Sequence, residues 1–158
     1  MNATLIPDAR RLLSMAVTLA LAACGGAEDA SAVSEAATTE AAPPESRVVI
    51  SGPEHGSDVD GPSVNIVLQA EGLAIVPAGV DQPGSGHHHL IVNADFPAMD
   101  VPIPAVPGES IHLGQAQTEF ELTELSPGEY RVIAVVGDHL HVPLNPPVSD
   151  TVHFTVRE

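Results

Sequence analysis

The stretch LSPGEYRVIAVVGD, residues 125–138, combines a turn with a strand and indicates the fold of the chain. Its Ser-Pro-Gly turn leads into Tyr130, a pattern typical of the tyrosine corner of immunoglobulin-like domains, where the phenol hydroxyl bonds back to nearby backbone. The following residues are apolar at odd and even positions alike, which predicts a central strand covered on both faces. Antibody domains have a cysteine two residues after this tyrosine, whereas this chain has Val132 there and no tryptophan. We therefore expect an immunoglobulin-like architecture held together by aliphatic packing.

The other apolar runs of the chain alternate with period two, which predicts half-buried strands. Proline and glycine separate these runs, and none of them sustains the spacing of a helix. The runs are residues 47–51, 64–70, 88–94, 118–125 and 150–158. About six or seven short strands predict an all-β, immunoglobulin-like antiparallel β-sandwich that forms one domain over residues 47–158.

The start of the chain is typical of a bacterial lipoprotein leader. Arg10 and Arg11 precede an apolar segment, residues 12–23, that is too short to span a bilayer but suits the core of a signal peptide. The sequence Leu-Ala-Ala-Cys that ends at Cys24 resembles a lipobox, in which the cysteine sulfur receives a diacylglyceryl group. We therefore expect removal of residues 1–23 and lipidation of Cys24, which would anchor the protein to a membrane on its extracytoplasmic, periplasmic side.

Residues 24–46 are expected to form a disordered acidic linker behind this anchor. They consist mainly of Ala, Ser, Thr, Glu, Gly and Pro, with no aromatic residue, so they cannot bury enough apolar surface to fold alone. Gly25 follows the cysteine in place of the aspartate that retains many such lipoproteins at the inner membrane, which favours the outer membrane in a cell that has two. Cys24 is the only cysteine, so the chain forms no intramolecular disulfide.

The formal net charge is −16, and the chain contains no lysine. After removal of the leader, Arg47, Arg131 and Arg157 are the remaining cationic side chains. Such a surface repels nucleic acid phosphates and concentrates cations, so we expect no nucleic acid partner. Two interpretations of the charge remain open: solubility, including adaptation to salty surroundings, and attraction of a cationic ligand.

The most distinctive polar feature is GSGHHHLIVN, residues 84–93. In an extended backbone, His87 and His89 share one face of the strand while His88 points to the other. Two imidazoles so placed can converge on one ion, each nitrogen about 2.0–2.1 Å away. The triplet therefore predicts a pair of metal ligands.

A second His-X-His pattern, GDHLHVP at residues 137–143, offers His139 and His141. If the two pairs meet, four imidazoles would suit Cu(II) in a tetragonal field or Zn(II) in a tetrahedral one. Cu(I) is disfavoured because it prefers thiolate and thioether ligands, and the lone cysteine is expected to carry lipid. Asp138 is a further candidate, as a ligand or as a group that orients His139.

Other roles for the histidines remain open. The triplet could instead form a hydrogen-bonded network that holds the proline-rich segment 96–114, or it could act as a pH switch near neutrality. His88 and His112 are further candidate ligands or supporting groups, although a structural role is favoured for His112 in the sequence SIHLGQ. We expect His55 and His153 to be solvated surface residues.

Four motifs together resemble a bacterial family, the domain of unknown function numbered 4399, over about residues 51–157: VPAGVDQPGSGHHHLIV, HLGQAQTEFEL, LSPGEYRVIAVVGDHLHVP and PPVSDTVHFTV. The positions that carry the pattern are Gly86, His87, His88, His89, Gln115, Gly137, Asp138, His141 and Pro143. Family members often have a histidine where this chain has Asn145, so the resemblance places no ligand there. The resemblance implies an exported β-domain and no established activity. The final strands are also similar to the copper-resistance protein C family of immunoglobulin-like periplasmic copper carriers.

Enzyme motifs are missing from the sequence. There is no G-x-S-x-G elbow and no phosphate-binding glycine loop. Cupins share the His-X-His pattern of His87 and His89, but no glutamate follows here at the cupin spacing. We therefore expect a non-catalytic protein. We expect either a metal-binding lipoprotein that buffers, carries or senses the ion, or an envelope interaction module that binds another protein or a glycan and whose histidines are structural. A third possibility, metal-dependent catalysis, needs an open coordination position and a substrate cleft.

Overall fold

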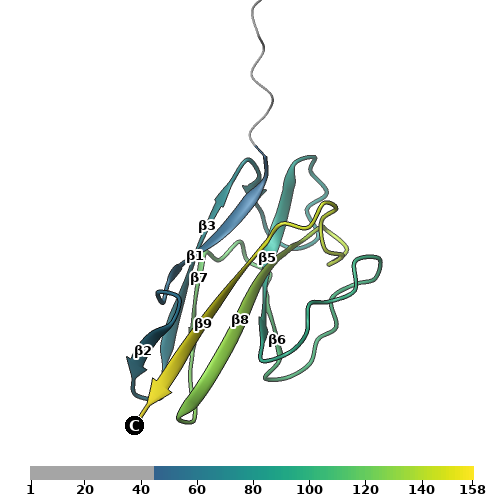
Figure 1. Cartoon of the computed structure of the whole chain (residues 1–158). Coiled ribbons are helices and arrows are strands. Elements are labelled where there is room, and N and C mark those ends of the chain that lie inside the picture. Colours follow the sequence, from purple (N-terminus) through teal and green to yellow (C-terminus); the bar gives the residue numbers. More distant parts are fainter. Residues whose placement is uncertain (1–44) are drawn as a thin grey trace, which may run out of the picture. The chain divides into compact units, whose positions relative to one another are not determined.

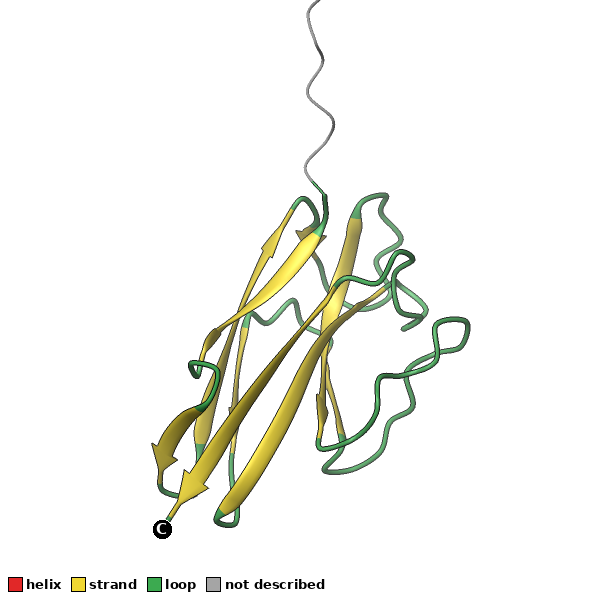
Figure 2. Cartoon of the chain, viewed as in Figure 1, coloured by secondary structure: helices red, strands yellow, loops and turns green. Residues whose placement is uncertain are grey.

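The computed structural model describes residues 45–158. In this range the chain forms strands and loops, as Figure 2 shows, and no helix is long and apolar enough to span a membrane. The expected signal peptide, the expected lipidation site at Cys24 and the expected linker up to residue 44 lie outside the described residues.

Nine strands make up two sheets (Figure 1). They are β1 (Arg47–Gly52), β2 (Ser57–Asp60), β3 (Val64–Glu71), β4 (Ala74–Ile75), β5 (Ser85–Val92), β6 (Ser110–Leu113), β7 (Glu119–Leu122), β8 (Gly128–Gly137) and β9 (Ser149–Arg157). The smaller sheet has the order β1-β3-β7. The larger has the order β2-β9-β8-β5-β4, and β6 pairs with β5 beside β4.

The prediction of an all-β sandwich is confirmed, and all six predicted apolar runs contain strands. The additional strands are β2, β4 and β6, which have only two to four residues and therefore too few positions to show an alternating pattern. Most pairings are antiparallel, but β2 with β9 and β4 with β5 are parallel. Both parallel pairings involve strands that the sequence pattern did not reveal.

The tyrosine corner forms as predicted at the start of β8. The hydroxyl of Tyr130 donates to the carbonyl oxygen of Ser126 and accepts from the amide of the same residue, each at 3.1 Å. These two bonds close the turn that leads into β8. Val132 to Gly137 are then buried, because β8 lies between β5 and β9 in the larger sheet and both of its faces are covered.

The main core fills the space between the two sheets. Its members are the inward positions of both sheets, so the period-two pattern of the sequence becomes the inner face of each strand. They are Val48, Ile50, Val64, Ile66, Leu68, Leu90, Val92, Leu113, Leu122, Val132, Ala134, Val136, Val148, Val152, Phe154 and Val156. We call this set the sandwich core.

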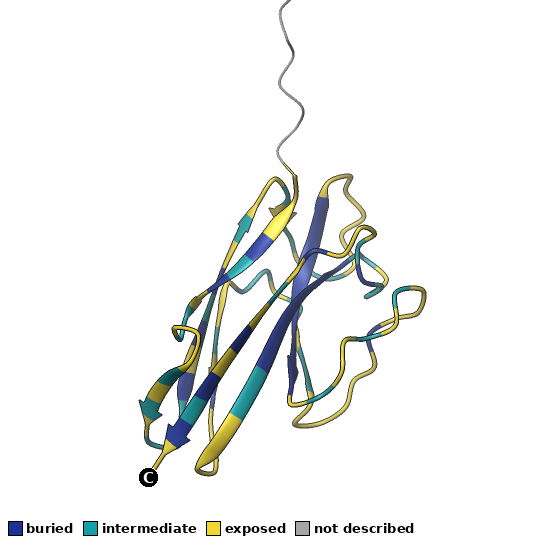
Figure 3. Ribbon diagram, viewed as in Figure 1, coloured by how far each residue is buried: buried dark blue, intermediate teal, exposed yellow. Residues whose placement is uncertain are grey.

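A second, smaller apolar cluster covers the outer face of the larger sheet. It consists of Ile91 on β5, Ile133 and Val135 on β8, and Ile103 from the loop that joins β5 to β6. Because this loop covers the outer face, all eight residues of β5 are buried, and Figure 3 shows the strand in dark blue along its length. The histidine triplet therefore lies in a strand that is protected from water on both sides.

Candidate metal centre

The two faces of β5 separate the histidine triplet. His88 lies directly opposite Val136 of β8 and Leu113 of β6, which both belong to the sandwich core. Directly opposed residues of antiparallel strands share a face, so His88 points into the sandwich. By the alternation of the strand, His87 and His89 point to the outer face.

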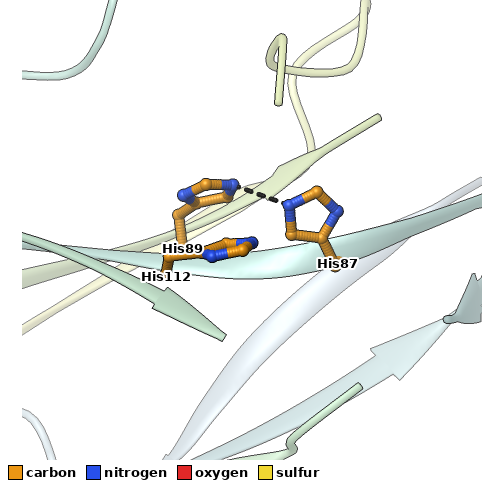
Figure 4. Close-up of side chains that lie close together, drawn as sticks. All are labelled: His87, His89 and His112. Carbon is orange, nitrogen blue, oxygen red and sulfur yellow. Dashed lines mark hydrogen bonds between the residues drawn. The ribbon is translucent and has the colours of Figure 1, made fainter. Parts of the chain in front are cut away.

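His112 joins the two outward histidines from the neighbouring strand. It lies opposite His89 in the register of β5 and β6, and the ligand atoms of His87, His89 and His112 all lie within 4.8 Å of one another (Figure 4). The Nε2 atoms of His87 and His89 are 3.0 Å apart. At this distance one neutral ring donates a hydrogen bond and the other accepts it.

The spacing of the ring nitrogens of His87 and His89 suits two ligands of a single transition-metal ion. Two nitrogens that each lie about 2.0–2.1 Å from an ion are about 2.9 Å apart at a right angle and about 3.3 Å apart at the tetrahedral angle. The 3.0 Å between the Nε2 atoms of His87 and His89 falls within this interval. An ion would replace the proton that these two rings share.

A fourth ring, that of His141, lies against the other three. Its centroid is 4.8 Å from the rings of His87 and His112 and 5.7 Å from the ring of His89. His141 comes from the loop after β8 and has a positive φ of 68°. We call His87, His89, His112 and His141 the histidine cluster.

The structure does not bring His139 into the histidine cluster, although the sequence pattern predicted this. Its Nδ1 atom lies instead 3.5 Å from Oδ1 of Asp81. The reason is that β8 ends at Gly137 and the chain then turns, so His139 and His141 are not alternate positions of one extended strand. His112, for which the sequence favoured a structural role, supplies the third ring of the cluster.

The sequence predicted Asp138 as a ligand or as a partner of the His139 ring. The structure gives it a different role. Its Oδ1 atom accepts hydrogen bonds from the backbone amides of Leu140 and Val142, at 2.8 and 2.9 Å. The carboxylate therefore organises the backbone of the loop that carries His141.

His88 is separate from the cluster and has no polar partner. Its side chain is fully buried, and neither Nδ1 nor Nε2 makes a hydrogen bond. Burial lowers the pKa of His88 to about 4, so the ring is neutral at pH 7. A buried polar group without a partner costs about 1–3 kcal/mol, which makes His88 a destabilising residue of the sandwich core.

Three histidines of the cluster, His87, His89 and His112, are also neutral at pH 7. Burial lowers the pKa of His87 to about 4, with smaller lowering effects from His112 and His141 and an opposing effect from Asp138. Burial, followed by the charge of His87, lowers the pKa of His89 to about 3, and burial also lowers the pKa of His112. Neutral imidazole is the form that binds metal ions, so the site needs little deprotonation before an ion enters.

Two glycines, which have no side chain, make room for the rings of His112 and His89. A Cβ atom on Gly114 would lie 2.3 Å from Cε1 of His112, and one on Gly137 would lie 3.2 Å from Nε2 of His89. The first distance is a direct clash, and the second is a tight contact. The glycines therefore let these rings lie against the backbone.

The sequence contained one indication of the role of His112 that the prediction did not use. Apolar residues, Ile111 and Leu113, flank it in the sequence, and in the fold Leu113 packs in the sandwich core. An alternation of this kind places His112 on the outer face of a strand. It does not reveal which strand lies alongside, and that pairing is what brings His112 to His89.

Together, the fold and the site define a β-sandwich protein with a histidine cluster on the outer face of its larger sheet. The family model described as a domain of unknown function (DUF4399) matches residues 66–157, so the chain belongs to this family, as its motifs predicted. No curated protein matches the chain. The crystal structure of an engineered protein is similar to this chain, with a TM-score of 0.46 and 14% sequence identity. The similarity covers 74% of this chain. This chain spans 21% of the length of that protein.

Proposed function

We propose that this protein binds one divalent transition-metal ion, Cu(II) or Zn(II), at the histidine cluster and thereby buffers, carries or senses that ion. The observation that carries the proposal is the convergence of ligand atoms from His87, His89 and His112 within 4.8 Å. These ligands are all imidazoles, which suit copper and zinc better than the oxygen-preferring Mg²⁺ or Ca²⁺. His141 is the fourth ligand in this proposal, since its ring contacts those of His87 and His112.

A binding role is favoured over a catalytic one by the burial of the two ligands on β5, although His112 on β6 is exposed. His87 and His89 are only 1% and 2% exposed. A catalytic ion needs an open coordination position that faces a substrate cleft, whereas a storage or transport site can be closed. We therefore propose no catalytic step.

The proposal also includes a location. Lipidation at Cys24 would hold the protein on the extracytoplasmic side of a membrane, with the outer membrane favoured. The net charge of −16 would raise the local concentration of metal cations near the domain.

Calorimetric titration of the untagged, full-length protein with Cu(II) and with Zn(II) tests the metal proposal. We expect one ion per chain with a Kd tighter than about 10 μM, which corresponds to about −7 kcal/mol. A folded His87→Ala, His89→Ala double variant should lose this binding. The matched control is His55→Ala, His153→Ala, which removes another pair of neighbouring imidazoles, with ring centroids 5.3 Å apart. Absence of binding at this affinity in the unmodified protein would rule out the proposal.

A second candidate is an envelope interaction module whose histidines hold its loops in place. One observation favours it: the carbonyl oxygen of His141 accepts a hydrogen bond of 2.9 Å from the amide of Ile103, so the histidine cluster and the covering loop are already connected without an ion. This candidate predicts capture of one defined envelope protein that is unchanged by a chelator. The metal proposal predicts that a chelator removes the bound ion from the protein.

A further inference from the structure

Two kinds of hydrogen bond close the turn between Asp138 and Val142: bonds between backbone groups, and bonds from backbone amides to the side chain of Asp138. The amide of Asp138 donates to the carbonyl oxygen of Val142 at 2.8 Å, and the amide of His141 donates to the carbonyl oxygen of Asp138 at 2.9 Å. In addition, Oδ1 of Asp138 accepts from the amides of Leu140 and Val142. One carboxylate oxygen therefore fixes two of the backbone groups of the turn.

This turn holds His141 in an unusual backbone conformation. A φ of 68° lies in the left-handed region, which residues with a Cβ atom rarely adopt unless surrounding bonds enforce it. Here the bonds to Asp138 enforce it from within the turn. The bond from the amide of Ile103 to the carbonyl oxygen of His141 holds the same residue from the covering loop.

The conformation of His141 decides where its imidazole lies. In a continued strand, His141 and His139 would point to the same face, whereas the turn directs His141 toward His87 and His112 and leaves His139 beside Asp81. The ring of His141 reaches the cluster because the backbone reverses at this point.

We propose that Asp138 is a positioning residue, whose carboxylate holds the turn that delivers His141 to the ion as its fourth ligand. The inference rests on the proposed function, namely that the histidine cluster binds a metal ion. Asp138 acts through the backbone, since its Oδ1 atom is already occupied by two amide donors. Groups that orient metal ligands typically contribute about 10- to 100-fold to metal affinity.

The test compares Asp138→Ala, Asp138→Asn, His141→Ala and the Asp138→Ala, His141→Ala double variant of the full-length protein. Two quantities are measured: the Kd for Cu(II) by calorimetry, and the number of coordinated imidazoles by X-ray absorption and electron paramagnetic resonance. We expect four imidazoles in the unmodified protein and three in Asp138→Ala, with affinity weakened by about 10- to 100-fold. Asp138→Asn keeps an acceptor oxygen in the same place and should keep all four.

The double variant separates positioning from general destabilisation. If Asp138 acts through His141, removing its carboxylate leaves the number of coordinated imidazoles unchanged once His141 is absent, and the change in Kd is no larger than the effect of charge loss measured in Asp138→Asn. Asp150→Ala serves as a control, because the carboxylate of Asp150 also accepts two backbone amide bonds, from Ile50 and Thr151 at 2.8 Å each, on the side of β9. That variant should lose stability and retain its metal affinity.

Each outcome supports or overturns the inference. Four imidazoles in Asp138→Ala, or additive effects of the two substitutions, would overturn it while leaving the metal proposal intact. No binding by the unmodified protein would overturn both. If Asp138→Ala does not fold, Asp138→Glu is the deciding variant, because it keeps the charge but displaces the acceptor oxygen. We expect this variant to bind the ion through three imidazoles.

Discussion

His89 and His112 lie directly opposite each other on the antiparallel strands β5 and β6. This cross-strand pair joins two residues that are separated in the sequence by the long covering loop. It places His112 on the same face as His87, and it creates a three-imidazole site from a strand that supplies only two ligands. The register of one short strand therefore determines whether the site exists.

The first prediction concerns His112 itself. His112→Ala should weaken Cu(II) or Zn(II) binding at least about tenfold, equivalent to about 1.4 kcal/mol, because it removes one ligand. The fold should persist, since the residue is exposed on a short edge strand. Calorimetry measures the affinity, and thermal unfolding checks the fold. His153→Ala, an exposed histidine on β9, is the control and should bind like the unmodified protein.

The second prediction concerns Gly114, which is no ligand. Gly114→Ala adds a methyl group whose carbon would lie 2.3 Å from Cε1 of His112, so the ring must leave its place in the cluster. We expect metal affinity to fall although every histidine is still present. Gly52→Ala is the matched control, because its new methyl group would meet its nearest atom at 3.5 Å, an ordinary contact. Equal affinities in the two variants would contradict the described position of His112.

The third prediction concerns His88. His88→Leu replaces a buried ring without hydrogen-bond partners by an apolar side chain of similar volume. The free energy of unfolding should rise by about 1–3 kcal/mol, because the unsatisfied polar atoms are removed. Metal affinity should stay the same, since the side chain points into the sandwich core. Urea unfolding and calorimetry together test this, and a loss of stability would indicate an unrecognised partner of His88.

The fourth prediction concerns the stability of the fold at acidic pH. The pKa values of His87 and His88 are lowered to about 4 in the folded chain from 6.5, so the unfolded chain takes up protons first as the pH falls. The stability of the metal-free protein should be complete above about pH 6.5 and should decrease as the pH falls to about 4, by about 1.4 kcal/mol per pH unit for each such histidine.

Urea unfolding of the metal-free protein at several pH values between 7.5 and 5 measures this dependence. His88→Leu should show a shallower slope, because one of the titrating groups is absent. A midpoint that stays constant over this range would show that these histidines are protonated to the same extent in the folded and unfolded chains.

The fifth prediction concerns the membrane. Cys24→Ser should release the protein from the membrane fraction, because the sulfur that would carry the lipid is absent. Mass spectrometry of the N-terminal peptide should show an acylated Cys24 in the unmodified protein and none in the variant. An unmodified Cys24 in a protein that is still exported would indicate an ordinary secretory leader.

The sequence predicted those parts of the molecule that follow from local periodicity. Strand alternation separated His88 from His87 and His89, and the turn before Tyr130 predicted the tyrosine corner. The family motifs and the pattern of strands agreed with the fold that forms.

The remainder of the site depends on long-range pairing and on a turn. His112 reaches the cluster through the pairing of β6 with β5, and a four-residue strand carries too little pattern to reveal its partner. The His-X-His pattern places His139 at the site only if the backbone stays extended beyond Gly137. The hydrogen bonds of Asp138 reverse the chain there, so only His141 enters the cluster.

The spread of the four rings along the chain, from His87 to His141, also fixes when the site can form. If the proposed leader exports the chain before it folds, these rings are far apart while the chain crosses the membrane. The cluster is assembled only after β5, β6 and the turn beyond β8 have all emerged and packed. The ion would then be acquired from the compartment where folding ends, so the metal supply outside the cytoplasm, rather than inside it, would decide which ion the protein carries.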